Sequence, residues 1–330
     1  MAQRSTRLVT IYGGSGFVGR YVARRLAKDG WRVRVACRRP NEALFVRAYG
    51  SVGQVEPVFC NIRNDDSVRA AAMGAQAVVN AVGILAESGR NTFGAVQAEG
   101  AERIARIAAE GVDRMALISA IGADAGSKSG YARTKAEGEA AVLRHMPASV
   151  IVRPSIVFGP EDQFFNRFAG MAARLPVLPV VGPDTRFQPV YVDDVAAAVA
   201  LGAEGRAAPG IYEVGGPDVD TFRELMGTML HVIKRRALLV RVPFFAATLM
   251  GMGLDLAQRA TFGLFRNGIL TRDQVRNLAR DNVVTGAHPG FEALGITPTS
   301  MEAILPTYLW RFQPSGQYAE IKESARNLRT

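Results

Sequence analysis

A tyrosine and a lysine stand four residues apart in the segment Tyr131-Ala-Arg-Thr-Lys135. Residues at this spacing share one face of a helix, so both side chains would point to the same side. A lysine ammonium beside a tyrosine hydroxyl favours the phenolate, which makes Tyr131 a candidate acid and base near neutral pH. Lys135 could also donate a hydrogen bond to the ribose of a nicotinamide nucleotide. The alternative is the first turn of an ordinary amphipathic helix.

A glycine-rich turn lies between the apolar run Leu8–Tyr12 and a helical pattern. It consists of Gly13, Gly14, Ser15, Gly16, Phe17, Val18 and Gly19. Glycine at a strand-to-helix turn lets the backbone approach a pyrophosphate closely, and the helix N-terminus offers unpaired N–H groups and a positive dipole end. The placement predicts a dinucleotide site, with a purely structural turn as the alternative.

Two arginines follow the second apolar run, at the place where an NAD-specific site carries a carboxylate against the ribose 2′-hydroxyl. The sequence there reads Cys37-Arg38-Arg39. A guanidinium can bind a 2′-phosphate through two hydrogen bonds, and no carboxylate is present to repel it. Arg38 and Arg39 therefore favour NADP(H), with NADPH as the reduced form. Two solvated loop arginines are the alternative.

Strand-like and helical patterns alternate through the first half of the chain. Strands are expected at residues 8–12, 32–37, 55–59, 77–80, 115–119 and 149–153, and helices at 18–29, 41–49, 65–73, 91–110 and 131–145. Gly30 and Gly111 are expected to end helices, and Asn41 and Asp65 to be N-caps. The alternation predicts an α/β fold, a Rossmann-type doubly wound parallel sheet.

Past residue 153 the pattern changes to short pieces punctuated by proline and glycine. Such pieces are typical of loops and short helices that build a smaller lobe over the ligand edge of a sheet. We predict an NADP(H)-binding Rossmann domain at residues 1–160, whose sheet is completed by parts of 185–215. Residues 161–330 would form the smaller C-terminal lobe and a segment near a partner or a membrane.

The composition narrows the class of function. With 330 residues, 48% of them hydrophobic, and a formal net charge of +10, the chain can bury a sizeable core and is not intrinsically disordered. Its 2 cysteines and 3 scattered histidines predict neither a disulfide framework nor a metal site. No nucleic-acid-binding module is recognisable. The short polar lead before the first strand leaves no room for a signal peptide, so we expect a cytoplasmic protein.

These motifs resemble the extended or atypical short-chain dehydrogenase/reductase family over the first two thirds of the chain. The resemblance adds Cys60-Asn61-Ile62, Asn80-Ala81-Val82-Gly83, Ser119 and Arg153-Pro154-Ser155 to the glycine turn and the Tyr131 motif. Within that family, residues 153–166 and 188–195 look like the nucleotide-binding accessory subunits of respiratory complex I (NADH:ubiquinone oxidoreductase), in a bacterial form.

The resemblance implies that NADPH is held without joining electron transfer. It implies Asn61 and Ile62 on the adenine side, Ala81, Val82 and Gly83 beside the adenosine ribose and pyrophosphate, and Pro154 on the nicotinamide side. The implied partners are other complex I subunits of the peripheral arm, near the membrane. The implied location is peripheral, on the cytoplasmic side of the bacterial inner membrane, with no transmembrane helix.

One position departs from the family pattern. Family enzymes carry a catalytic Ser or Thr two residues beyond Ser119, and this chain has Ile121 there. Isoleucine cannot donate a hydrogen bond to a substrate carbonyl, so the contact is missing unless Ser119, Ser127 or Ser129 supplies it. Loss of one such donor costs roughly a hundred- to a thousandfold in rate. We therefore expect binding without turnover.

Tyr131, Lys135 and Ser119 would then be vestigial catalytic residues. Because Tyr131 and Lys135 are intact, an active NADP-dependent reductase or epimerase is the first alternative, with a nucleotide sugar or a hydroxysteroid-like molecule as substrate. A redox-sensing regulator that binds NADP(H) and a protein partner is the second. The fold alone cannot choose, since many functions share it.

A basic and partly apolar segment covers residues 234–280. Nine Lys or Arg and two Asp lie within 231–280, and the basic ones are Lys234, Arg235, Arg236, Arg241, Arg259, Arg266, Arg272, Arg276 and Arg280. The apolar stretch 242–254 is shorter than the roughly 20 residues that span a bilayer. We expect an interfacial element attracted to anionic lipid headgroups. The alternatives are a helix of the smaller lobe with solvated charges, or a surface for a partner subunit.

Overall fold

A computed structural model describes residues 7–260, 271–314 and 316, without the side chains of 257–260. Its centre is a parallel sheet of seven strands in the order β11-β6-β5-β4-β1-β2-β3. The strands are β1 (Leu8–Tyr12), β2 (Arg32–Cys37), β3 (Val55–Phe59), β4 (Ala77–Asn80), β5 (Arg114–Ile118), β6 (Val150–Pro154) and β11 (Gly210–Val214). The first four match the predicted strands, and β5 and β6 are displaced by one residue. The predicted Rossmann-type sheet is confirmed.

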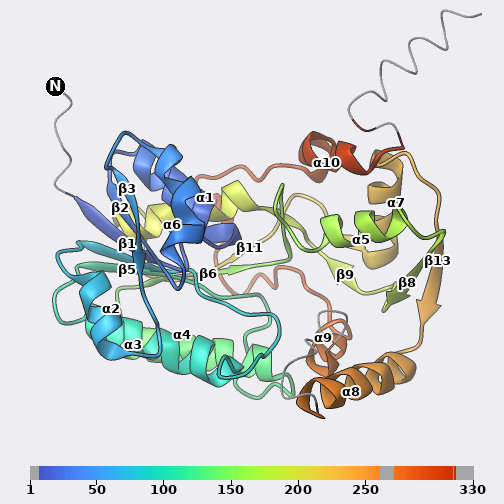
Figure 1. The fold of residues 1–330 in the computed structure, drawn as a ribbon, viewed down its shortest axis with the longest axis horizontal. Helices are drawn as coiled ribbons and strands as arrows, with labels where there is room; N and C mark the ends of the chain where they lie inside the picture. The colour runs from blue at the N-terminus through green and yellow to red at the C-terminus, as the bar shows by residue number, and fades with distance from the viewer. Residues whose placement is uncertain (1–6, 261–270, 315, 317–330) are drawn as a thin grey trace, which may run out of the picture.

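Helices cover both faces of this sheet (Figure 1). One face carries α1 (Phe17–Lys28) and α6 (Val192–Glu204), and the other carries α2 (Asp65–Ala72), α3 (Glu99–Ala108) and α4 (Gly130–His145). Burying both faces explains why β1 and β4 read as nearly continuous apolar runs. Two predicted helices differ in kind: residues 41–49 lie in the 3-10 helix η1 (Pro40–Tyr49), and residues 91–110 are divided between the π-helix η2 (Gly94–Ala98) and α3.

The predicted C-terminal ends of two helices, at Gly30 and Gly111, are correct, whereas the two predicted N-caps, Asn41 and Asp65, are wrong. Gly30 N donates to Ala27 O and Gly111 N to Ala108 O, so both glycines follow the last helical turn. Asn41 is not an N-cap, because η1 already begins at Pro40. Asp65 is the first residue of α2, and Asn64 caps that helix by accepting a hydrogen bond from Ser67 N at 2.7 Å.

A second group of elements forms the C-terminal lobe, at the right of Figure 1. Its longer elements are α5 (Phe165–Ala172), β8 (Val177–Val181), α7 (Phe222–Val232), β13 (Leu238–Val242), α8 (Phe244–Ala260), α9 (Arg272–Asn277) and α10 (Met301–Leu309). The short ones are β7 (Val157–Phe158), β9 (Arg186–Phe187), β10 (Val190–Tyr191), β12 (Asp220–Thr221) and η4 (Trp310–Phe312). The 3-10 helix η3 (Phe291–Leu294) packs instead on the core between the central sheet and α6. Its core includes Phe158, Phe165, Leu178 and Leu225, all fully buried. β13 pairs with β8 in parallel.

The chain returns from the lobe to the sheet. α6 packs on the face that α1 covers, and β11 pairs with β6 at the sheet edge. The division into domains at residue 160 stays a prediction. No helix among the described residues is both long and apolar enough to cross a bilayer.

Candidate functional site

The glycine turn connects β1 to α1 beside the end of β4. Gly13 has a φ of +75°, and a Cβ there would stand 2.9 Å from Ala81 O and 3.1 Å from Val82 N. Gly16 is the N-cap of α1 and has no side chain to occupy the first N–H groups of the helix. The turn therefore lies close to the end of β4, and it leaves the first N–H groups of α1 open to an anionic ligand.

The carboxyl end of β4 lies beside the glycine turn, where the order of the strands reverses. Asn80 is 2% exposed, and its Oδ1 accepts a hydrogen bond from Val82 N at 3.0 Å, which fixes the residues after the strand. A Cβ at Gly83 would stand 3.6 Å from Lys135 Nζ. The predicted residues Ala81, Val82 and Gly83 thus join the glycine turn to the Tyr131 motif, at the edge where open α/β sheets bind ligands.

Tyr131 and Lys135 lie together on α4, as the spacing predicted. Lys135 Nζ donates to Ile118 O at 3.0 Å and lies 6.0 Å from the centroid of the Tyr131 ring. Burial lowers the pKa of Lys135 to about 8. Burial, followed by the carboxylate of Asp273, raises the pKa of Tyr131 to about 12. The expected preference for phenolate is therefore wrong: burial and the carboxylate of Asp273 both favour the neutral phenol.

The low pKa of Lys135 should make the free energy of unfolding depend on pH. Between pH 8 and 10.5 the unfolded chain holds the Lys135 proton and the folded protein releases it, so the free energy of unfolding rises with pH in this window. The rise is on the order of 3 kcal/mol. Urea unfolding of the wild type and of Lys135→Met at several pH values measures it, and the difference between the two should change only across this window. Parallel pH profiles would contradict the assignment.

Ser119 and Ile121 follow β5 at the same edge. The Ser119 side chain is 4% exposed, and its hydroxyl has no hydrogen-bond partner in the described structure. Ile121 is buried and offers no donor. Ser129 is not available to replace it, because its hydroxyl donates to Asp273 at 2.8 Å. Ser127 Oγ accepts from Ser129 N at 3.2 Å and keeps its own proton to donate. Of the three serines considered, Ser119 is the one whose buried hydroxyl makes no hydrogen bond within the described residues.

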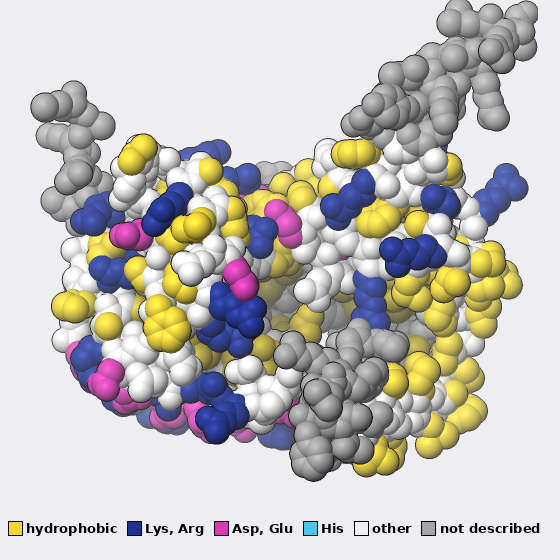
Figure 2. Space-filling view, viewed as in Figure 1, with side chains coloured by type: hydrophobic (Ala, Val, Ile, Leu, Met, Phe, Trp, Pro, Cys, Tyr) yellow, Lys and Arg dark blue, Asp and Glu magenta, His cyan; other side chains and the backbone are white. Residues whose placement is uncertain are grey.

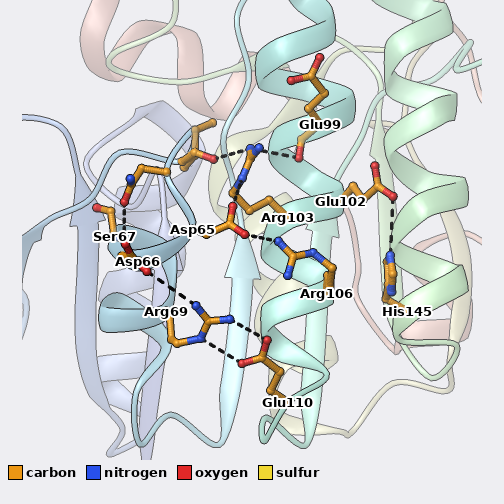
Figure 3. A network of polar contacts seen from close by, with 12 residues as sticks. Asp65, Asp66, Ser67, Arg69, Glu99, Glu102, Arg103, Arg106, Glu110 and His145 are labelled. Atoms are coloured by element: carbon orange, nitrogen blue, oxygen red, sulfur yellow. Dashed lines mark hydrogen bonds and ion pairs between the residues drawn. The ribbon is translucent and has the colours of Figure 1, made fainter.

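Pro154 completes the carboxyl edge, because Ile121 N donates to its carbonyl oxygen at 3.0 Å. Asn61 and Ile62, the predicted adenine-side residues, follow β3 at the other end of the edge. The segment is fixed by α3: Arg103 donates to Ile62 O at 3.0 Å and to Asp65 at 2.6 Å, and Arg106 also pairs with Asp65. Figure 3 shows this network between α2 and α3.

Arg38 and Arg39 directly follow β2 and are both exposed. Arg39 pairs with Glu42 at 3.0 Å. An arginine that we did not predict contacts the glycine turn directly: Arg20, in α1, donates to Ser15 O at 3.2 Å and to Gly16 O at 3.3 Å. The only signal for Arg20 in the sequence was its place one residue after Gly19. Asp273 was missed as well, because it is 142 residues from Tyr131.

The segment 234–280 places an apolar stripe on the surface. Phe245, Leu249, Met252 and Leu256, at helical spacing on α8, are 71%, 64%, 45% and 67% exposed. Leu238 and Val240 of β13 are also exposed, and we call these six residues the outer face. Figure 2 shows hydrophobic side chains gathered over β13 and α8. Arg236 and Arg241 are exposed beside it, whereas Arg266 and the side chain of Arg259 lie outside the described residues.

The comparisons with known proteins agree with this geometry. The NAD dependent epimerase/dehydratase family matches residues 9–215. NADH dehydrogenase (ubiquinone) 1 alpha subcomplex subunit 9, mitochondrial, of Arabidopsis thaliana is 33% identical over 316 residues, which are 94% of this chain and 79% of that protein. A ceramide reductase of Caulobacter vibrioides is 33% identical over 245 residues, 74% of this chain and 76% of that protein.

A solved structure supports the fold. The UDP-glucose 4-epimerase of Thermus thermophilus, in complex with NAD, has a TM-score of 0.67 at 19% identity, over 92% of this chain and 98% of that one. The matched family covers β1 to β11, and so includes the glycine turn, the end of β4 and the Tyr131 motif. From its sheet, its nucleotide edge and these matches, the chain belongs to the NAD dependent epimerase/dehydratase family.

Proposed function

We propose that this chain is an accessory subunit of respiratory complex I that holds NADP(H) as a structural cofactor without turnover. One observation carries the proposal: a complete nucleotide turn stands beside a catalytic position filled by the buried Ile121. The raised pKa of Tyr131 points the same way, because a phenol that stays protonated near neutral pH is a poor base. The relative from Arabidopsis thaliana, named as a complex I subunit, supports the partner.

The residues at the edge of the sheet fit a dinucleotide. Added Cβ atoms at Gly13 and Gly19 would clash with backbone atoms of Ala81, Gly13 and Gly14, so only glycine lets the turn lie this close to β4 and α1. The buried Ser119 hydroxyl has no partner among the described residues, and a ligand could supply one. NADPH, when bound, supplies a hydride. The glycine turn would hold the pyrophosphate, Lys135 would donate to the ribose, and Ser119 would donate toward the nicotinamide side.

Specificity for the 2′-phosphate rests on Arg38 and Arg39. Replacing both by alanine should weaken NADPH by roughly tenfold to a hundredfold, since charge-assisted hydrogen bonds contribute on the order of 1.5–3 kcal/mol. NADH, which lacks that phosphate, should lose at most about twofold. Fluorescence titration of the double variant with both nucleotides measures the two losses. Equal losses would refute the assignment of the 2′-phosphate site.

The outer face supports a place on the peripheral arm, next to the cytoplasmic surface of the inner membrane. Its six side chains are all apolar, and Arg236 and Arg241 are exposed beside it, Arg241 in an ion pair with Asp184 at 3.0 Å. An apolar helix face with basic neighbours suits an anionic lipid surface, with roughly 1 kcal/mol from each cation near it. On this arm the chain would support the assembly or stability of the complex.

Gentle solubilisation of native membranes tests the proposal. The chain should co-migrate with NADH:ubiquinone oxidoreductase on a native gel, and NADP(H) should be recovered from the denatured purified protein. Migration as a small free species would overturn the role as a subunit. Recovery of NAD(H) in place of NADP(H) would overturn the choice of cofactor and leave the role as a subunit standing.

A second function is favoured by the intact Tyr131 and Lys135 and by the relative named ceramide reductase. In that function the chain is an NADP-dependent reductase or epimerase, and Ser119 donates to the substrate carbonyl in place of Ile121. Candidate substrates are a nucleotide sugar, a hydroxysteroid-like molecule or a long-chain carbonyl lipid. Oxidation of bound NADPH by one of these carbonyl compounds, lost in Tyr131→Phe, would support the enzyme. NADPH that stays reduced with all of them would support the structural role.

A further inference from the structure

The C-terminal lobe caps the helix that carries Tyr131 and Lys135. Asp273, in α9, accepts hydrogen bonds from Gly130 N at 2.8 Å, from Tyr131 N at 3.3 Å and from the Ser129 hydroxyl at 2.8 Å. A carboxylate here satisfies N–H groups that α4 cannot pair internally, and it meets the positive end of the helix dipole. The direction of the Tyr131 motif thus depends on a residue from another part of the chain.

Polar contacts join α9 to the Rossmann domain. Besides Asp273, Arg276 donates to Lys128 O at 2.9 Å, Gln274 donates to Leu85 O at 3.5 Å, and Arg280 pairs with Asp124 at 4.0 Å. Among residues 7–260 and 271–314, the buried apolar cluster that contains Val275 of α9 consists otherwise of C-terminal lobe residues. A joint made of hydrogen bonds and an ion pair can open without exposing apolar core, because its groups can bind water instead.

Contacts of a different kind join α9 to α8. Ala247 and Val275 are both buried in one cluster, and a Cβ at Gly251 would stand 3.0 Å from Arg272 N. Asp255 Oδ2 accepts a hydrogen bond from that same nitrogen at 3.1 Å. Close backbone approach and buried apolar contact make α8 and α9 one unit, so a force on α8 is carried to α9.

The two faces of α8 have different surroundings. Ala247, Gly251 and Asp255, spaced four residues apart, face α9. The outer face uses another side of the helix, at Phe245, Leu249, Met252 and Leu256, whose mean direction is roughly 130° from that of the first set by the 3.6-residue period. One helix therefore presents an apolar surface outward and holds the cap of the Tyr131 helix inward.

We propose that α9 is a clasp that links the nucleotide site to the outer face. Docking of the outer face on an anionic lipid surface holds Asp273 on the N-terminus of α4, and Asp273 in this place keeps NADP(H) bound. Asp273 is a positioning residue, since it acts through Tyr131 and Lys135. The inference rests on the proposed function for both ligands. It adds that their binding is coupled, and coupling of binding free energies is reciprocal.

NADPH titrations of the full chain, with and without vesicles, test the clasp. Vesicles of phosphatidylcholine mixed with phosphatidylglycerol should tighten NADPH by roughly fivefold or more, and NADPH should tighten vesicle binding by the same factor. This reciprocal pair of measurements needs no variant. Tightening of neither ligand by the other, in protein that binds both, would overturn the clasp and leave the proposed function intact. Failure to bind any nucleotide would instead overturn the proposed function.

Substitutions at Asp273 and Asp124 test which residue couples NADPH binding to vesicle binding. Asp273→Ala should lose on the order of tenfold in NADPH affinity and should no longer respond to vesicles. Asp273→Asn keeps one acceptor oxygen, so its NADPH affinity should lie between those of the wild type and of Asp273→Ala. This variant replaces the alanine variant in the test if the alanine variant does not fold. Asp124→Ala is the matched control, because it removes a carboxylate from the same joint without uncapping α4, and it should keep the vesicle response. An unchanged response in Asp273→Ala and Asp273→Asn would overturn the role of Asp273.

The same titrations identify the occupant of the outer face. Phosphatidylcholine vesicles alone should give less tightening than the anionic mixture, because the basic residues around the face contribute only against negative headgroups. Equal tightening by both kinds of vesicle would overturn the anionic character of the occupant. Tightening by purified complex I in detergent, with none from vesicles, would assign the face to a protein partner and overturn the lipid surface.

Discussion

Gly19→Ala is expected to weaken NADPH binding by roughly tenfold to a hundredfold, because overpacking typically costs 1–3 kcal/mol. The added Cβ would stand 2.8 Å from Gly14 Cα and 3.0 Å from Gly13 C, and it would also overlap Gly13 O. All of these are backbone atoms, so no side chain can swing aside. The turn must therefore move away from α1, and its N–H groups no longer meet the pyrophosphate in the same place.

Fluorescence titration with NADPH measures the loss, and thermal unfolding separates it from general destabilisation. Gly111→Ala is the matched control. A Cβ at Gly111 has no atom within 4 Å, so this variant should keep the wild-type affinity and change stability by at most about 0.5 kcal/mol. Wild-type affinity in Gly19→Ala would show that the nucleotide does not lie on this turn.

The parts of the site that the sequence predicted are those fixed by local pattern. A run of apolar residues gives β1 because both faces of the sheet are buried, and the glycines must then lie at its carboxyl end. The same logic brings Asn80 and Ser119 to one edge, since parallel strands end on the same side. The place of each predicted residue follows from strand order, which the alternation of strands and helices already restricts.

The parts that could not be predicted depend on contacts between distant segments. Nothing in the pattern around residue 273 indicates that its carboxylate reaches α4, since that contact requires the fold of the whole lobe. The direction of the Tyr131 pKa was missed for the same reason: burial and Asp273 both come from tertiary structure. The N-cap of α2 is a smaller error: we predicted Asp65 and the cap is Asn64, a difference of one residue at a helix boundary.

A buried ion cluster behind the site was also outside the prediction. Arg153, at the end of β6, pairs with Glu139 of α4 at 2.6 Å and with Glu213 of β11 at 3.5 Å. The two carboxylate side chains are 5% and 3% exposed. Glu213 also accepts hydrogen bonds from Thr285 N at 2.9 Å and from the Thr285 hydroxyl at 2.6 Å. The cluster thus joins the helix of Lys135 to β11 and to β6, the strand that ends at Pro154.

Arg153→Leu is expected to lower the free energy of unfolding by about 3–5 kcal/mol, the usual cost of leaving a buried charge without its partner. Glu139 raises the pKa of Arg153, so the guanidinium is charged in the wild type and its loss leaves two carboxylates close together in the interior. Arg153→Leu combined with Glu139→Leu should recover part of the loss, because one of the stranded charges is then gone.

Urea unfolding of these variants measures the cost. Arg69→Ala is the control, because its pair with Glu110 has a similar distance of 2.8 Å but side chains 48% and 49% exposed, and its removal should cost at most about 1 kcal/mol. A cost for Arg153→Leu as small as that of Arg69→Ala would show that water reaches the cluster. The helix of Tyr131 and Lys135 would then be held to the sheet by apolar packing and by the hydrogen bond from Lys135 to Ile118 O, and the charges of the cluster would contribute little to its geometry.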